Sequence, residues 1–173
     1  GKTAADVINE SSTDELADIL RKYGEVRSAG KVAKAIVANR PYSSTTELAS
    51  RIGQVIRTKT RIHPATKVFQ ALRIAVNDEL SQLADSLPIW VDLLNHKGRI
   101  GVISFHSLED RLVKQAFSEY GGNRYDAKLQ IVTAKPVISG DEEVVFNPRA
   151  RSAKLRAAVK INIKGRGSNA DTG

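Results

Sequence analysis

An almost unbroken apolar run over residues 99–105 constrains the fold more than any other feature of the sequence. A short apolar run of this kind is typical of a strand buried on both faces, as in a parallel sheet covered by helices. A helix is predicted to follow over 107–120, with Ser107 and Asp110 as its capping pair. Because ligands bind at the carboxyl ends of the strands in open parallel sheets, we expect His106 to lie at a binding site.

Two further strands are predicted nearer the C-terminus. The first covers about 129–137 and is limited by Pro136 to an edge or a strand end. The second covers 154–164 and has the clearest alternation in the chain. Leu155 and every second residue after it point one way, while Arg156 and its basic or amide neighbours point the other way. This period of two predicts an antiparallel strand with one basic face exposed to water.

The N-terminal third of the chain is predicted to form short helices joined by tight turns. Ser12 and Glu15 form a predicted capping box, and Gly24 supplies a C-terminal stop. The predicted helices cover about 14–23, 26–39, 46–56 and 64–84. A polar stripe along the last of them is either a solvated surface or a contact surface, and it consists of Thr66, Gln70, Arg73 and Asn77.

The net charge of +8 is concentrated in two blocks. Residues 51–75 and residues 149–173 each carry a net charge of +6, and the rest of the chain is slightly acidic. Concentrated cations suggest a phosphate-rich partner, because each phosphate that they neutralise releases bound counterions. The alternative explanation is solubility together with a basic tail, and we prefer it for residues 164–173.

The composition argues against several kinds of site. The chain has no cysteine, so it can form no disulfide and no thiolate metal site. Its three histidines are scattered at spacings that resemble no ligand set, so we expect no metal. The apolar stretches are much shorter than the roughly 20 residues that a membrane span needs. We therefore expect a cytoplasmic protein without a membrane partner. Because methionine is absent, either an initiator was removed before Gly1 or the chain is a piece of a longer protein, and we favour the second.

Four stretches of the chain together resemble the MraW family of ribosomal RNA methyltransferases. Each stretch alone is short, but all four occur in the family's order and cover nearly the whole chain. They are Tyr23-Gly24-Glu25 with Arg27, the block from His63 to Leu80, the block from Gly98 to Lys114, and Asn147 to Ser152 with Leu155 and Arg156.

The resemblance implies an α/β fold: the C-terminal half of a doubly wound class I methyltransferase (Rossmann-like) sheet, preceded by a small all-helical inserted domain. On this template residues 1–60 are the helical domain, which would recognise RNA, and residues 61–173 are the last part of the methyltransferase domain. The resemblance also implies S-adenosylmethionine as methyl donor. The implied acceptor is the N4 amine of a cytosine in small-subunit (16S) ribosomal RNA.

The family's donor site lies in segments that this chain does not contain: a glycine-rich loop after the first strand, an acidic residue after the second and an Asp-Leu-Gly segment after the fourth. No Gly-x-Gly loop between a predicted strand and helix occurs here either. We therefore expect this chain alone to bind no S-adenosylmethionine and to be inactive. The missing N-terminal half is the expected partner, and the strand 99–105 is expected to pair with that half or with a second copy.

The candidates for lining the acceptor site are His106, Ser104 and Ser107, because polar groups near the cytosine amine can hold it and accept its proton. For His106, the alternative is a helix-terminal residue that only bonds the neighbouring loop. For His63, which precedes a helix, we favour an orienting role in the turn.

Arg149 and Arg151 are the preferred contacts for RNA phosphates, because an arginine fork suits phosphate geometry. The alternative for both is an ion pair with the acids at 141–143. The full set of RNA-binding candidates is Arg57, Lys59, Arg61, His63, Lys67, Arg73, Arg111, Lys114, Arg149, Arg151, Lys154 and Arg156. The alternative function is a non-enzymatic RNA- or DNA-binding module, and a strand buried on both faces favours the enzyme.

Overall fold

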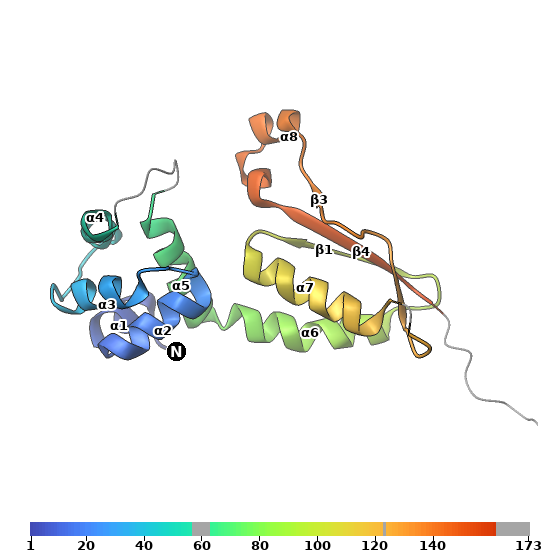
Figure 1. Cartoon of the computed structure of the whole chain (residues 1–173), viewed down its shortest axis with the longest axis horizontal. Helices are drawn as coiled ribbons and strands as arrows, with labels where there is room; N and C mark the ends of the chain where they lie inside the picture. Colours follow the sequence, from blue (N-terminus) through green and yellow to red (C-terminus); the bar gives the residue numbers. More distant parts are fainter. Residues whose placement is uncertain (57–62, 123, 162–173) are drawn as a thin grey trace, which may run out of the picture. The chain divides into compact units, whose positions relative to one another are not determined.

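The computed structural model describes residues 1–56, 63–122 and 124–161. The chain divides into two compact units, Gly1–Glu79 and Leu80–Gly173, each with its own hydrophobic core (Figure 1). The two compact units divide after Glu79, whereas the sequence predicts a domain boundary near residue 60, and one further helix packs into the core of the first unit. No helix in the described part of the chain is long and apolar enough to cross a membrane.

Within the described residues, the first unit consists of five helices. They are α1 Ala4–Glu10, α2 Thr13–Gly24, α3 Ala29–Val37, α4 Thr45–Val55 and α5 Ala65–Asn77. Helix α2 packs against both α3 and α5. Leu16 and Leu20 of α2 are fully buried in the same core as Ile36 of α3 and Val68 of α5. Helix α1 lies outside every predicted helix, and α3 is shorter than predicted at both ends.

The starts of α1 and α2 follow from local side-chain chemistry. The Ser12 hydroxyl accepts a hydrogen bond from the Glu15 N–H at 3.3 Å, and the Glu15 carboxylate accepts one from the Ser12 N–H at 2.8 Å. This confirms the predicted capping box. Thr3 and Asp6 form the same reciprocal pair at the start of α1. Caps of this kind stabilise a helix by about 1 kcal/mol, which matters most for the short α1.

The single helix predicted over 64–84 is two helices. Helix α5 ends at Asn77, Asp78 adopts a left-handed conformation with a φ of 49°, and α6 runs over Glu79–Leu93. Aspartate tolerates this conformation better than most residues, so the chain can turn there at little cost. Helix α6 also continues through Pro88, beyond the predicted helix end near residue 84.

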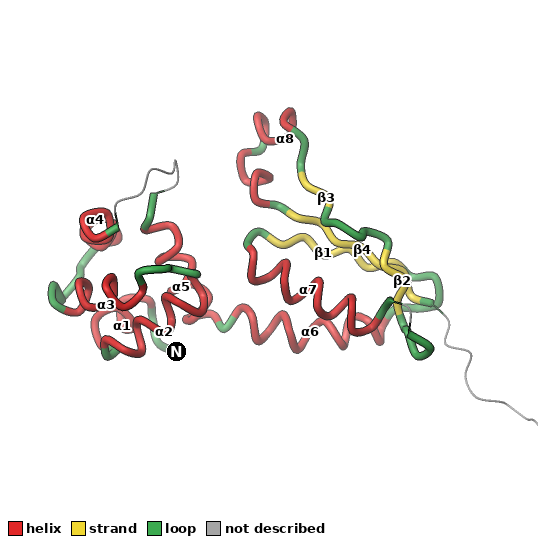
Figure 2. Tube along the Cα trace, viewed as in Figure 1, coloured by secondary structure: helices red, strands yellow, loops and turns green. Residues whose placement is uncertain are grey.

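The second unit combines helices with a small sheet (Figure 2). After α6, its elements are β1 Arg99–Ser104, α7 Ser107–Tyr120, β2 Leu129–Ile131, β3 Val137–Ile138, α8 Asp141–Phe146, the 3-10 turn η1 Pro148–Ser152 and β4 Lys154–Lys160. The predicted helix 107–120 is confirmed by α7. Helix α8 and η1 form an excursion between β3 and β4 that the sequence patterns do not predict.

Strand β4 is the centre of the sheet, and every described pairing is antiparallel. β1 pairs along one edge of β4, while β2 and β3 pair along the other. The strand predicted over 129–137 is therefore two short strands. Between them, the N–H groups of Val132 and Thr133 both donate to the carbonyl of Ala157, at 2.9 and 3.2 Å, so the regular ladder is interrupted.

Helices α6 and α7 cover one face of this sheet. Their buried side chains meet those of the strands in one core made of Leu87, Val91, Ile100, Val113, Phe117, Leu129 and Ala158. On the other face of β1, Ile103 is 57% exposed, and Phe105 just beyond the strand is 52% exposed. The prediction that this strand is buried on both faces is therefore wrong for this chain. No described strand pairs with the outer edge of β1 either.

The polarity predicted for β4 is also wrong, although its antiparallel pairing is confirmed. Arg156 and Ala158 are buried toward the helices, whereas Leu155 and Val159 are only half-buried on the opposite face. The register explains this, because Arg156 pairs with Val102 and Ala158 pairs with Ile100, both of which face the helices. The packing of the helices therefore decides which face of β4 is buried, and the alternation of residue types does not.

Candidate functional site at the carboxyl end of strand β1

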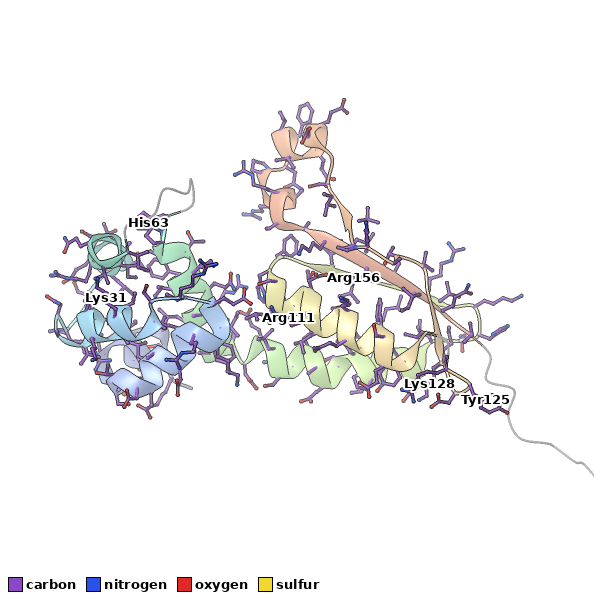
Figure 3. All side chains as sticks on the ribbon, viewed as in Figure 1. Lys31, His63, Arg111, Tyr125, Lys128 and Arg156 are labelled. Carbon is purple, nitrogen blue, oxygen red and sulfur yellow. The ribbon has the colours of Figure 1, made fainter. Side chains whose placement is uncertain are left out.

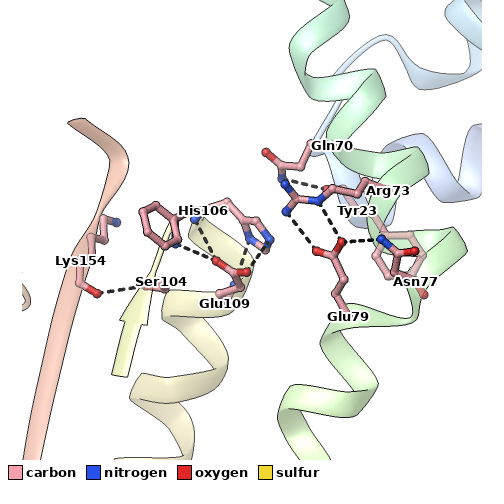
Figure 4. Close-up of polar contacts among 10 residues, drawn as sticks. Tyr23, Gln70, Arg73, Asn77, Glu79, Ser104, His106, Glu109 and Lys154 are labelled. Atoms are coloured by element: carbon pink, nitrogen blue, oxygen red, sulfur yellow. Dashed lines mark hydrogen bonds and ion pairs between the residues drawn. The ribbon is translucent and has the colours of Figure 1, made fainter. Parts of the chain in front are cut away.

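The register of β1 and β4 brings two loops to the same end of the sheet. Ser104 is the last residue of β1 and pairs with Lys154, the first residue of β4. The buried Ser104 hydroxyl donates to the Lys154 carbonyl at 3.4 Å (Figure 4). The segment after β1, which contains His106, and the turn η1, which precedes β4, therefore lie at the same end.

His106 is the N-cap of α7. Its Nδ1 accepts a hydrogen bond from the Glu109 N–H at 3.2 Å, and its Nε2 lies 3.3 Å from Glu109 Oε1 (Figure 4). The other oxygen, Oε2, accepts from the N–H groups of Phe105 at 2.7 Å and His106 at 3.2 Å. Glu109 thus fixes both the imidazole and the backbone of the turn. The predicted capping pair of Ser107 and Asp110 is wrong by one residue.

This geometry matches the helix-terminal alternative for His106. The side chain is only 7% exposed, and a neutral imidazole whose Nδ1 accepts a hydrogen bond carries its proton on Nε2. In this chain His106 therefore shapes the turn. The side chains that face solvent beside it are those of Phe105 and Ser107. Glu109 is a site residue that the sequence reasoning missed, although its spacing from His106 matches that of Ser12 and Glu15.

Asp110, one position further along α7, forms a buried ion pair with β4. Its carboxylate accepts hydrogen bonds from Arg156 Nε at 2.7 Å and Nη2 at 3.2 Å, and Lys154 Nζ lies at 3.5 Å. The hydrogen bond from Arg156 lowers the pKa of the Asp110 carboxyl below its ordinary value of 3.8. The Arg156 side chain is 9% exposed, so the ion pair gives it a structural role, while the predicted RNA contact stays a prediction.

Arg149 and Arg151 project from η1 and are exposed. Within the part of the chain that the structure describes, neither pairs with the acids at 141–143, so that alternative is not realised. The turn is braced, because Ser139 Oγ donates to the Ala150 carbonyl at 2.8 Å and Ala150 is buried. Two guanidinium groups on a braced turn are suited to binding phosphate or carboxylate groups.

The polar stripe on α5 is largely occupied by contacts within the first unit (Figure 4). Gln70 donates to the Tyr23 carbonyl at 3.2 Å. Arg73 donates to both carboxylate oxygens of Glu79 at 2.9 and 3.0 Å, and Asn77 donates to the same carboxylate at 3.1 Å. These bonds connect the end of α5 to the start of α6, which favours a structural role for Arg73.

The remaining candidates are placed differently. His63 Nδ1 accepts from the Ala65 N–H at 3.2 Å, which is the orienting role favoured for it. Lys67 and Lys114 are exposed on α5 and α7. Arg111 is exposed on α7 and already has an interaction partner (Figure 3). Arg57, Lys59 and Arg61 lie outside the described residues.

Comparison with known proteins gives the chain its family. The MraW methylase family model matches residues 1–161. Ribosomal RNA small subunit methyltransferase H of Bradyrhizobium diazoefficiens is 48% identical over 177 residues, and the protein of the same name from Nostoc punctiforme is 52% identical over 162 residues. These alignments cover 94% and 92% of this chain, but only 54% and 52% of the two relatives.

These matches place the chain among the methyltransferases. More specifically, it belongs to the MraW methylase family, as the four sequence stretches predict. The chain spans about half the length of the curated relatives it matches.

Proposed function

We propose that this chain is the substrate-side part of an S-adenosylmethionine-dependent methyltransferase that modifies the N4 amine of a cytosine in small-subunit ribosomal RNA. Family membership supports the class of reaction, and the names of the relatives support the RNA. The glycine-rich and acidic segments expected to hold the donor are not among the 173 residues. The chain alone is therefore proposed to bind no S-adenosylmethionine and to be inactive.

The observation that carries this proposal is the half-covered sheet. No strand in the described part of the chain pairs with the outer edge of β1, and the outer face of β1 exposes Ile103 and, just beyond it, Phe105. Trp90 and Leu93 of α6 are also exposed, and they line a groove with Gly101 and neighbouring residues of β1. An apolar strand edge beside an apolar groove favours pairing with another strand. We propose that the N-terminal half of the family's fold supplies that strand and the second covering layer.

In this arrangement, the donor-binding half would approach the end of the sheet where Ser104 and Ser107 lie. The cytosine amine is a weak nucleophile, because its lone pair is shared with the ring. Positioning it against the donor methyl therefore supplies much of the rate. We propose that Ser107 and the turn held by Glu109 help to position the base, while Arg149 and Arg151 hold the RNA backbone. A second copy of this chain is the alternative occupant of the β1 edge.

Calorimetry tests which half binds S-adenosylmethionine. S-adenosylmethionine is titrated into this chain, into the N-terminal half of a relative, and into their mixture. The proposal predicts no heat of binding with this chain alone and a one-to-one complex with the mixture. A one-to-one complex of micromolar affinity with this chain alone would contradict the proposal. RNA binding without any complex between the halves would favour the non-enzymatic nucleic-acid-binding module.

A further inference from the structure

The stretch from Val26 to Thr46 contains four basic residues and no acidic residue. It is separate from the two basic blocks at 51–75 and 149–173. The cations are Arg27, Lys31, Lys34 and Arg40. The structure divides them into one residue that turns inward and three that turn outward.

Arg40 is used inside the first unit. Its Nε donates to the Ile8 carbonyl at 2.5 Å, and its Nη2 donates to the Ser11 carbonyl at 2.6 Å, so it satisfies the carbonyl end of α1. The other three side chains point outward. Arg27 lies in the turn that leads into α3, and Lys31 and Lys34 lie on one exposed side of that helix (Figure 3 labels Lys31).

The opposite side of α3 fixes this orientation. Val32, Ala33 and Ile36 are completely buried in the core of the first unit, so the helix cannot rotate without exposing them. Lys31 and Lys34 are three residues apart and therefore neighbours on the helix surface. They form a row on α3, and Arg27 lies in the turn just before the helix begins at Ala29.

None of the three forms an ion pair or a side-chain hydrogen bond with any residue that the structure describes. The two cations of α2 differ in this respect. Arg21 pairs with Asp18, and the Lys22 Nζ lies 4.9 Å from the centre of the Tyr23 ring. Like charges at helical spacings of three or four destabilise a helix slightly. The row on α3 therefore carries a small cost that an anionic partner would remove.

We propose that Arg27, Lys31 and Lys34 form a binding surface for the phosphate backbone of RNA. The inference rests on the proposed function, because that function supplies an RNA substrate, and it names the residues of the helical unit that contact the RNA backbone. Cations on one exposed surface can contact several phosphates of the same strand. Contacts of this kind set the position of an RNA strand without reading its sequence. Arg149 and Arg151 in the second unit would then be a separate contact.

The test compares two pairs of substitutions that remove the same charge from neighbouring helices. K31Q/K34Q acts on the proposed surface, and R21Q/K22Q is the matched control. Binding of a small-subunit ribosomal RNA fragment to the full chain is measured by fluorescence anisotropy at several salt concentrations. Circular dichroism and thermal unfolding verify that each variant is folded. R27A is added to K31Q/K34Q as a third step.

For K31Q/K34Q we expect the affinity at low salt to fall about tenfold. The steepness of the plot of log affinity against log salt should decrease by about 1.4, because each lost single-strand phosphate contact accounts for about 0.7. Adding R27A should lower the slope again, and R21Q/K22Q should change little. Equal losses in the two pairs would mean that only net charge matters and would overturn the proposal. Unchanged binding by K31Q/K34Q would also overturn it.

A further arm separates an acidic protein partner from RNA. Polyglutamate is titrated against the bound RNA, and efficient displacement that depends on Lys31 and Lys34 would overturn RNA as the preferred occupant. Methyl transfer by the mixed halves tests the proposed function separately from RNA binding. If K31Q/K34Q binds RNA like the parent while methyl transfer by the mixed halves is intact, the surface is wrong and the proposed function stands. If the mixed halves transfer no methyl group, the proposed function fails.

Discussion

Asp110 on α7 holds Arg156 on β4 through two hydrogen bonds, of 2.7 and 3.2 Å, at a position where both side chains are largely buried. The sequence predicts Arg156 on the exposed basic face of its strand, but it instead forms the contact that attaches a helix to the sheet. Removing either partner leaves an uncompensated charge in a partly dry environment, so this pair should matter far more than an exposed one.

Substitution R156A should therefore lower the free energy of unfolding by about 3 kcal/mol, the range seen when one partner of a buried pair is removed. Urea unfolding followed by circular dichroism measures it. The matched control is R124A, because the side chains of Arg124 and Asp126 form an exposed ion pair whose loss should change stability little. Equal effects of R156A and R124A would show that the buried pair has no special role.

The same pair predicts an acid dependence of stability. The pKa of the Asp110 carboxyl is lowered in the folded chain by the hydrogen bond from Arg156, relative to an ordinary value of 3.8. The folded state therefore binds its proton less readily than the unfolded state. The stabilisation is complete well above 3.8 and is lost as the pH falls through the folded pKa. Urea midpoints between neutral pH and pH 3 should fall more steeply for the parent than for D110N. Parallel curves would contradict the prediction.

The cap of α7 predicts different effects for two substitutions of His106. H106A removes the acceptor for the Glu109 N–H and should destabilise the chain by about 1 kcal/mol. H106N should retain most of the stability, because asparagine is a good N-cap. Thermal unfolding of the two variants measures the difference. If H106N is as unstable as H106A, the ring has a role beyond the cap.

Local chemistry explains which parts of the fold can be read from the sequence. The capping box of Ser12 and Glu15 is specified by residues three positions apart, so its pattern suffices. The helix over 107–120 is predicted as well, although its capping pair is misplaced by one residue. The orientation of Arg156 and the break at Asp78 depend on partners supplied by other elements. Asp110 is distant in sequence from Arg156, and Glu79 pairs with Arg73 across the α5–α6 turn. Periodicity carries no information about such pairs.

The candidate site also combines features that the sequence predicts with features that only the structure shows. The sequence identifies the turn around His106. Only the structure shows that Glu109 forms hydrogen bonds both with the His106 imidazole and with the backbone of the turn. The continuous apolar run of β1 matches a strand covered on both faces, yet the second face is uncovered here. The apolar pattern of β1 does not say which of its two faces is covered, and the described residues of this chain cover one of them.

The arginines of η1 predict salt-sensitive RNA binding. R149A/R151A should weaken binding of a small-subunit ribosomal RNA fragment at low salt and reduce the salt slope by about 1.4, at 0.7 per single-strand phosphate. The double variant R124A/K128A removes the same charge at the opposite end of the sheet and serves as control. Titrations by fluorescence anisotropy give both quantities. An unchanged affinity together with an unchanged slope would exclude η1 as an RNA contact.

Methyl transfer on mixing the two halves tests the central claim most directly. This chain, the N-terminal half of a relative, S-adenosylmethionine labelled in its methyl group and unmodified small-subunit RNA are combined, and the nucleosides are then analysed by mass spectrometry. The account predicts N4-methylcytidine only when both halves are present. Replacing the exposed Ile103 of β1 with lysine should lower the yield, because it places a charge where the second covering layer would pack. Labelled cytidine from this chain alone, or none from a mixture shown by light scattering to form a complex, would contradict the account.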